Sequence, residues 1–234
     1  MEMLNRMIDI PIIYEDNHLL VVEKPVNILS QEDHTGDPDI LSLLKEDIKI
    51  RYNKPGNVYL GLIHRLDRPV GGTMVFAKTS KSASRLSKEI RDRKFEKVYL
   101  AVLKGIPINK KDSLRHYLLK DNEYNRVFAV RKDTKGAKEA ILDYEIIDTN
   151  ENLSLVKINL HTGRPHQIRV QFASIGHPLY GDQRYGIRDG KNNIALWSYE
   201  ISCTHPTLKE RMTFKTYPPK VEPWKKFNIF KSKF

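Results

Sequence analysis

The densest group of ionisable side chains lies at residues 64–68, His-Arg-Leu-Asp-Arg, where one carboxylate stands among three basic side chains. A carboxylate beside arginines is normally held ionised, which suits it to act as a nucleophile or a base. A structural ion pair uses the same residue types. However, Pro69 and two glycines follow Asp67 before an apolar run begins. This pattern indicates a rigid loop at a strand end, where catalytic groups are often mounted.

A second group of chemically useful side chains spans residues 161–169, His-Thr-Gly-Arg-Pro-His-Gln-Ile-Arg. A strand is predicted to end here, a glycine turns the chain, and apolar residues then recur at helical spacing. Backbone N–H groups at a helix start, with Arg164 and Gln167 nearby, suit an anion. Arg169 lies within the predicted helix, so its direction is better fixed than that of a loop arginine.

Metal binding is not expected. His161, His166 and His177 lack the compact spacing of metal ligands. The single cysteine, Cys203, cannot form an internal disulfide or a cysteine-rich site, and we expect it to be a small core residue on a strand.

The charge balance favours an anionic partner. The 234-residue chain carries a formal net charge of +11, and 40% of its residues are hydrophobic, as in globular proteins. Nucleic acid is the commonest partner of such a charge, although a generally basic surface would give the same excess. No apolar run reaches the length of a membrane span, and acids in the first twenty residues exclude a typical signal peptide. We therefore expect a cytoplasmic protein without a membrane partner.

The elements that must position these side chains are many strands and few helices. The sequence predicts helices over 39–52 and over 81–95 with Ser80 as N-cap, and strands over 12–13, 19–22, 72–78, 98–103, 137–147, 153–160, 194–199 and 213–217. Because the two types do not strictly alternate, we expect an α+β fold with a mixed, mostly antiparallel sheet. One domain over 1–234 is expected, with its core over about 10–217 and a basic tail over 218–234.

These segments together resemble the RluA-type pseudouridine synthases. The resemblance rests on HLLVVEKPVNILS at 18–30, HRLDR at 64–68, AKT at 77–79, KVYLAV at 97–102, TGRPHQIRVQFASIGHPLYGDQRYG at 162–186 and WSYEISCTHP at 197–206. It covers roughly residues 10–217, and such long, ordered motifs are very improbable by chance. It implies a pseudouridine-synthase-like sheet flanked by helices and loops, with the active-site cleft across it.

The resemblance also implies roles for individual residues. Asp67 matches the catalytic aspartate, Tyr99 the active-site tyrosine and Arg169 the basic residue that pairs with the aspartate. The residues it places in substrate binding are Arg65, which helps open the RNA and hold the flipped site, Ile168 beside the tyrosine, and His64, Arg68, Arg164, His166 and Gln167. The sequence leaves open whether Asp67 attacks the base, attacks the sugar or acts as a base on the ribose.

The implied activity is isomerisation of uridine to pseudouridine in structured ribosomal or transfer RNA, without cofactor or metal, by base flipping. A monomer is expected. One alternative is a non-catalytic RNA-binding or ribosome-assembly protein on the same fold. Another is a hydrolase or nuclease using Asp67 with His64 or His166, which would need a metal or a second acid.

Two features bear on the choice of RNA. Pro69-Val70-Gly71-Gly72 replaces a Thr-Ser-Gly run that many relatives carry after this motif, and the separate basic N-terminal RNA-binding domain of many relatives is not found. Substrate choice is therefore expected to come from the surface of this domain. The lysine-rich tail over 218–234 has two interpretations, a contact with RNA phosphates beside the cleft or a solvated tail.

Overall fold

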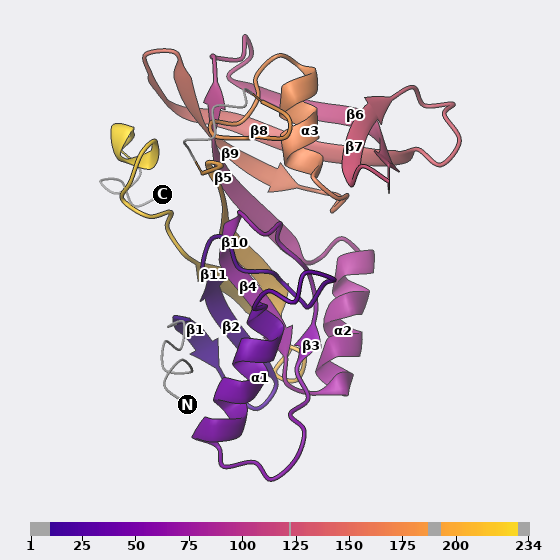
Figure 1. Ribbon diagram of the computed structural model, residues 1–234, viewed down its shortest axis with the longest axis vertical. Helices are drawn as coiled ribbons and strands as arrows, with labels where there is room; N and C mark the ends of the chain where they lie inside the picture. Colours follow the sequence, from indigo (N-terminus) through magenta and orange to yellow (C-terminus); the bar gives the residue numbers. More distant parts are fainter. Residues whose placement is uncertain (1–9, 122, 187–192, 229–234) are drawn as a thin grey trace.

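The alternating side chains of Leu19–Val22 explain the layers of the N-terminal half. In the computed structural model, which describes residues 10–121, 123–186 and 193–228, this segment belongs to strand β2 (Leu19–Lys24). Leu20 and Val22 pack with helix α1 (Ile40–Arg51), and Leu19 and Val21 pack with helix α2 (Ser80–Arg91). Because successive side chains of a strand point to opposite faces, the two helices cover opposite faces of the sheet (Figure 1).

The described strands form one continuous sheet in the order β1-β2-β4-β10-β5-β9-β8-β6-β7, with β3 paired to β4 and β11 to β10. Of these pairings only β4 with β10 is parallel. The bounds of the remaining strands are β1 (Ile12–Glu15), β3 (Gly61–Leu62), β4 (Gly71–Ala77), β5 (Glu96–Lys104), β6 (Lys111–Asp121), β7 (Arg126–Val130), β8 (Lys138–Asn150), β9 (Leu153–Leu160), β10 (Leu196–Thr204) and β11 (Arg211–Lys215).

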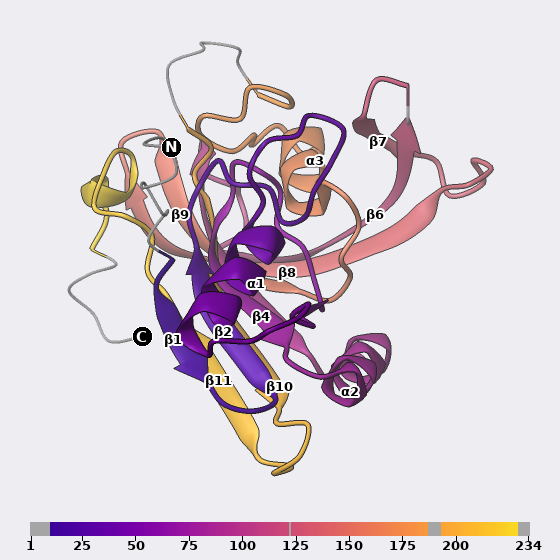
Figure 2. The same cartoon turned by 60° about the horizontal axis from the view of Figure 1, so that its bottom comes forward.

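The sheet joins two halves of the molecule. β5 and β10 run between a half that holds β1–β4 with α1 and α2, and a half that holds β6–β9 with helix α3 (Gln167–Ser174) (Figures 1 and 2). α1 and α3 contribute to one large buried cluster, on the sheet face that also carries Tyr99. The active-site candidates on the β3–β4 loop and on α3 therefore share one face.

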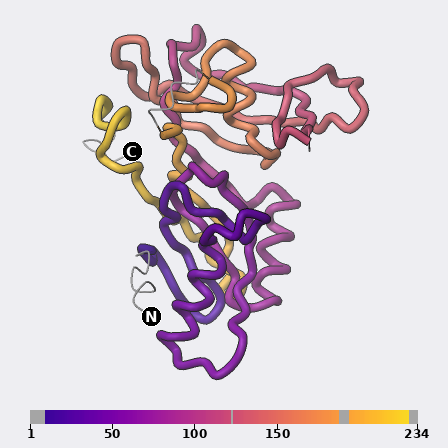
Figure 3. The backbone as a smooth tube through the Cα atoms, viewed as in Figure 1, coloured from indigo at the N-terminus to yellow at the C-terminus, as the bar shows by residue number. Residues whose placement is uncertain are grey.

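The C-terminal segment packs on the other face. Val98 and Leu100 of β5 lie in a second buried cluster with Trp224 and Phe227, which are each 4% exposed. A short 3₁₀ helix, η1 (Trp224–Lys226), places Trp224 there, and the tube in Figure 3 shows this yellow segment returning to the upper half. Of the two interpretations of the tail, a fully solvated segment does not hold up to residue 228, because buried Trp224 and Phe227 anchor it on the face opposite Tyr99. The end of that tail, 229–234, lies outside the described residues.

The α+β class and the mostly antiparallel sheet are confirmed. Cys203 is buried on β10, as expected. Three details differ besides the end of α2, which falls at Arg91 and not at residue 95, and the short strand β3, which the sequence did not predict. The N-cap of α2 is Thr79, not Ser80, because the Thr79 hydroxyl accepts the Ser82 N–H at 3.1 Å. β10 extends to Thr204 instead of ending near Tyr199.

The third difference is the β6–β7 hairpin, which the sequence did not predict. β6 buries Leu114 and Leu118 while most of its other side chains are exposed or half-buried, so its apolar pattern is weak.

Of the helices within the described ranges, none is long and apolar enough to cross a bilayer.

Candidate active site

Asp67 lies in the loop between β3 and β4, and this loop is fixed from beneath. The Ser30 hydroxyl donates to the Leu66 carbonyl at 2.7 Å and accepts the Leu66 N–H at 3.0 Å. The Val70 N–H donates to the Asp67 carbonyl at 2.9 Å and closes a turn. The rigid loop expected behind the aspartate is therefore present, and its hydrogen bonds hold the backbone on both sides of Asp67.

The fully buried Lys24 supports the same loop. Its ammonium donates to the carbonyls of Pro25, Arg68 and Val70 at 2.9, 3.2 and 2.8 Å. Burial lowers the pKa of Lys24 to about 7, although the negative charge of nearby Asp67 acts to raise it. Three carbonyls use all three donors of the ammonium, so Lys24 clamps both sides of Pro69.

The two glycines after Pro69 let another strand come close. A Cβ at Gly71 would collide with Trp197, and one at Gly72, where φ is +117°, would collide with the Ser198 backbone. Trp197 and Ser198 pair with these glycines in the parallel β4–β10 ladder. The loop after Asp67 therefore ends in a close contact with β10.

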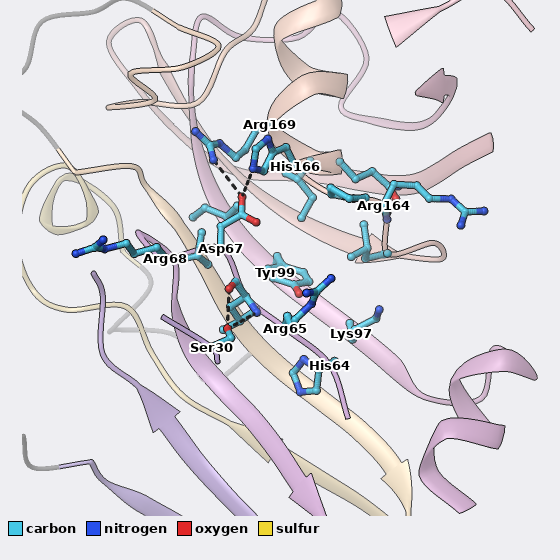
Figure 4. Close-up of a pocket in the computed structure, with 18 of the residues that line it drawn as sticks. Ser30, His64, Arg65, Asp67, Arg68, Lys97, Tyr99, Arg164, His166 and Arg169 are labelled. Carbon is cyan, nitrogen blue, oxygen red and sulfur yellow. Dashed lines mark hydrogen bonds and ion pairs between the residues drawn. The ribbon is translucent and has the colours of Figure 1, made fainter. Parts of the chain in front are cut away.

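Arg169 reaches Asp67 from α3, although 102 positions separate them. Its Nη1 donates to Asp67 Oδ2 at 3.1 Å, and the two side chains are 8% and 28% exposed (Figure 4). Burial alone would lower the pKa of Arg169, but Asp182 first and Asp67 second raise it above its usual value. The guanidinium is therefore charged at physiological pH, and it leaves Asp67 open to the solvent on one side.

Asp182 is the buried carboxylate that orients Arg169, and the sequence reasoning missed it. Its side chain is 0% exposed and accepts from Nε and Nη2 of Arg169, both at 2.8 Å. Burial acts to raise the pKa of Asp182, and hydrogen bonds from Arg169 and two backbone N–H groups lower it overall. The Gly-Asp pair within the long second motif was the available signal.

Tyr99 lies on β5 at the floor of the same cleft, 6% exposed, with Ile168 in the same buried cluster. Burial, and secondly the Asp67 charge, raise the pKa of Tyr99. The hydroxyl is therefore protonated at neutral pH, and a proton-accepting role would first require it to give up its own proton.

The other candidates differ in how far they remain available. Arg65 is exposed, and Figure 4 shows its guanidinium in the cleft between Tyr99 and Lys97. Arg68 pairs with Asp37 at 2.6 Å. Gln167 is buried. Its side-chain oxygen accepts from the Thr162 hydroxyl and the Arg164 N–H, and its side-chain nitrogen donates to the Ile141 carbonyl and the Gln171 side-chain oxygen.

Two further candidates each make one side-chain hydrogen bond to the backbone. Arg164 Nε donates to the Glu139 carbonyl at 2.9 Å. His64 Nε2 accepts the Val75 N–H at 3.1 Å and its ring faces Phe95, so this ring supports the cleft floor. His166 lies close to the aspartate, with Nε2 4.0 Å from Asp67 Oδ2.

These residues line one open cleft of about 2020 Å³ whose wall is basic. Among the described residues its cations are Arg65, Arg68, Arg91, Arg93, Lys97, Lys120, Arg164, Arg169 and Arg184, and its acids are Glu32, Asp33, Asp67 and Glu96. Such a wall attracts a polyanion. The described part of the chain holds no cluster of three His, Cys, Asp or Glu suited to a metal ion.

Comparison with known proteins identifies the family of this chain. The family model described as RNA pseudouridylate synthase matches residues 18–174. An uncharacterised RNA pseudouridine synthase of Aquifex aeolicus is 34% identical over 227 residues, covering 91% of this chain and 70% of the relative. Ribosomal large subunit pseudouridine synthase D of Borreliella burgdorferi is 31% identical over 234 residues, covering 97% and 69%. The chain spans about two thirds of the length of these relatives.

Solved structures agree on the fold. The human RNA pseudouridylate synthase domain containing 4 superposes with a TM-score of 0.75 at 20% identity, covering 90% of this chain and 89% of that one. The chain therefore belongs to the RluA-type family of RNA pseudouridine synthases, as the resemblance indicated. Its activity is that of an RNA pseudouridine synthase, and family membership does not favour the non-catalytic alternative.

Proposed function

We propose that this enzyme isomerises a uridine of large-subunit ribosomal RNA, with Asp67 as its catalytic carboxylate. The observation that carries the proposal is the Asp67–Arg169 pair, which opens into a basic cleft beside Tyr99. The reaction breaks the bond from uracil N1 to the ribose, forms a bond from C5 to the same carbon, and moves one proton from C5 to N1. No atom is gained or lost, so the reaction asks of the cleft residues only that they assist bond cleavage, bond formation and one proton transfer.

The roles of the three central side chains follow from their surroundings. Asp67, ionised and partly exposed, supplies the negative charge that acts on the flipped nucleotide. Arg169, oriented by Asp182, holds that carboxylate in one direction, since positioning contributes as much as charge. The Tyr99 ring stacks beneath the uracil.

RNA contacts are assigned to the exposed side of the cleft. Arg65 projects into it and is suited to hold the RNA from which the base has left. Arg68, Arg164 and Lys97 supply further positive charge for phosphates, and Ile168 packs beside the uracil ring. Because protein atoms already engage them, we expect Gln167 to shape the loop before α3 and His64 to hold the floor.

The substrate class is inferred from relatives. Proteins named ribosomal large subunit pseudouridine synthase C or D, from Buchnera aphidicola and Borreliella burgdorferi, share 30–34% identity with this chain. We accordingly infer a cytoplasmic enzyme that acts as a monomer on ribosomal RNA, within one domain whose core is the described sheet.

The test is to map pseudouridines in ribosomal and transfer RNA from cells with the gene, without it, and with Asp67→Asn in its place. The proposal expects the same large-subunit site to lose its modification in both altered strains. Loss at a transfer RNA site would overturn the substrate class. An unchanged map in the deletion strain would overturn the proposed function.

A further inference from the structure

The loop at residues 182–185, Asp-Gln-Arg-Tyr, lies behind the Asp67 site and holds Arg169 in place; we call this loop the bracket. Asp182 fixes Arg169 by two hydrogen bonds and also accepts the N–H groups of Arg184 and Tyr185 at 2.9 and 3.1 Å. One buried carboxylate therefore sets the place of the arginine and of Tyr185 together. The Arg169 guanidinium lies 5.2 Å from the centre of the Tyr185 ring.

The bracket is also tied to β7. The Val127 N–H donates to the Tyr185 hydroxyl at 2.9 Å, and Arg184 donates to the Asn125 carbonyl. The Arg126 guanidinium lies 5.6 Å from each of the Phe128 and Tyr185 ring centres. The β6–β7 hairpin therefore holds the Tyr185 hydroxyl in a fixed place.

This hydroxyl is placed to select which nitrogen of His166 carries the proton. Tyr185 Oη lies 2.7 Å from His166 Nδ1, and it already accepts the N–H of Val127. A tyrosine hydroxyl has one hydrogen, and because its oxygen already accepts from Val127, donating that hydrogen to Nδ1 would use both roles of the hydroxyl. Nδ1 is then the acceptor, and the neutral ring carries its proton on Nε2, the atom 4.0 Å from Asp67 Oδ2.

The charges around His166 agree with a neutral ring. Burial is the largest influence on its pKa and lowers it, and Arg169 and Arg184 act in the same direction. Asp67 and Asp182 oppose them but do not reverse the shift. These groups come from the β3–β4 loop, α3 and the bracket, which are the elements that face the ring.

We propose that Tyr185 is a positioning residue that fixes the Nε2–H tautomer of His166 and aims this N–H at Oδ2 of Asp67. Arg169 already donates to Oδ2, so a second N–H aimed at the same oxygen leaves Oδ1 to react. The 4.0 Å separation is longer than a hydrogen bond. Such contacts tighten in the substrate complex, and RNA binding is expected to close this one. The choice of reacting oxygen rests on the proposed role of Asp67.

The first experiment records the ¹⁵N resonances of labelled histidines in the full chain without RNA, near neutral pH, with His166→Gln assigning the signal. We expect wild type to show the Nε2–H tautomer at His166, and Tyr185→Phe to show a mixture. Tyr59→Phe, a change at a half-exposed tyrosine that does not line the cleft, is expected to leave the tautomer unchanged. A charged or Nδ1–H ring in wild type overturns the proposal.

The second experiment compares kcat with RNA affinity. Tyr185→Phe is expected to lower kcat about tenfold while the Kd for RNA stays the same, because one orienting hydrogen bond is lost. His166→Gln, whose amide can place an N–H near Nε2, is expected to retain more activity than His166→Ala. Unchanged kcat in Tyr185→Phe, or a fall without any change of tautomer, overturns the proposal.

The two proposals fail separately. The tautomer is measured without RNA or turnover, so a wrong tautomer overturns the role of Tyr185 and leaves Asp67 as the catalytic carboxylate. Turnover by Asp67→Asn overturns the proposed function, and with it the choice of Oδ1 as the reacting oxygen.

Discussion

At the scale of single residues, the site combines one accessible carboxylate with buried supports. The Asp67 side chain is 28% exposed, whereas the Arg169 and Asp182 side chains are 8% and 0% exposed. Removing the charge of Asp67 would leave Arg169 still paired with Asp182, so no uncompensated buried cation results. Loss of the Asp67 charge is therefore expected to leave folding largely intact.

Asp67→Asn is expected to lower kcat by about 1000-fold or more, because the neutral amide cannot act as nucleophile or base. The thermal midpoint and the Kd for RNA should stay close to wild type. Turnover assays with a uridine-containing RNA measure kcat, thermal unfolding measures the midpoint, and RNA titration measures Kd. Asp47→Asn on α1, outside the cleft, is the matched control. Full activity in Asp67→Asn contradicts the assignment.

Tyr99→Phe is expected to lower kcat about 100-fold while RNA affinity is kept, because the ring still stacks and only the hydroxyl is lost. The measurement is kcat and Kd on the same RNA. Near-normal turnover would exclude any proton-transfer role of this hydroxyl.

His64 gives a prediction about acid stability. Burial first, and the Lys97 charge second, lower the pKa of His64 from 6.5 to about 3. Between these pH values the His64 side chain is protonated in the unfolded chain but not in the folded chain. The free energy of unfolding therefore falls as the pH falls from 6.5 toward 3. His64→Gln is expected to recover part of this loss, on the order of a few kcal/mol at most. Urea unfolding across that pH range tests it, with exposed His34→Gln as control; parallel curves for wild type and His64→Gln would contradict the prediction.

At the scale of elements, buried side chains fix two segments that lie outside the strands and α-helices. Lys24 and Ser30 hold the β3–β4 loop from beneath through backbone hydrogen bonds. Trp224 and Phe227 hold the C-terminal segment against β5 and β9. The first segment carries Asp67, and the second covers the opposite face of the strand that carries Tyr99.

Trp224→Ala is expected to lower the free energy of unfolding by about 3–5 kcal/mol, because a buried indole is removed. Urea unfolding measures the change. Val221→Ala, at a 54% exposed position of the same segment, should cost far less. Equal effects of the two changes would show that the segment does not depend on its aromatic anchor.

At the scale of the whole molecule, part of the net charge of +11 lies along the cleft. Cations outnumber acids along the cleft wall, and counterion release on RNA binding makes affinity depend on salt. The basic composition alone could not distinguish this from a uniformly basic surface.

Arg65→Ala is expected to weaken RNA binding and to reduce the slope of log K against log salt by about 1, as for one lost phosphate contact. Titrations across a salt series measure the slope. Lys49→Ala, at an exposed lysine of α1 that does not line the cleft, should leave it unchanged. The same slope change in both variants would show that binding follows net charge and not the cleft.

The sequence by itself determined the family, the α+β class and the identity of Asp67, Tyr99 and Arg169 as candidates, because motifs and apolar periodicity are local properties of the chain. Only the tertiary structure brought Arg169 to Asp67 across 102 positions, placed Asp182 behind it, and turned the Tyr185 hydroxyl toward His166. It also decided that Trp224 anchors the tail and that β6 and β7 form a hairpin. Periodicity reports what one element buries, whereas these contacts depend on the path of the chain between distant elements.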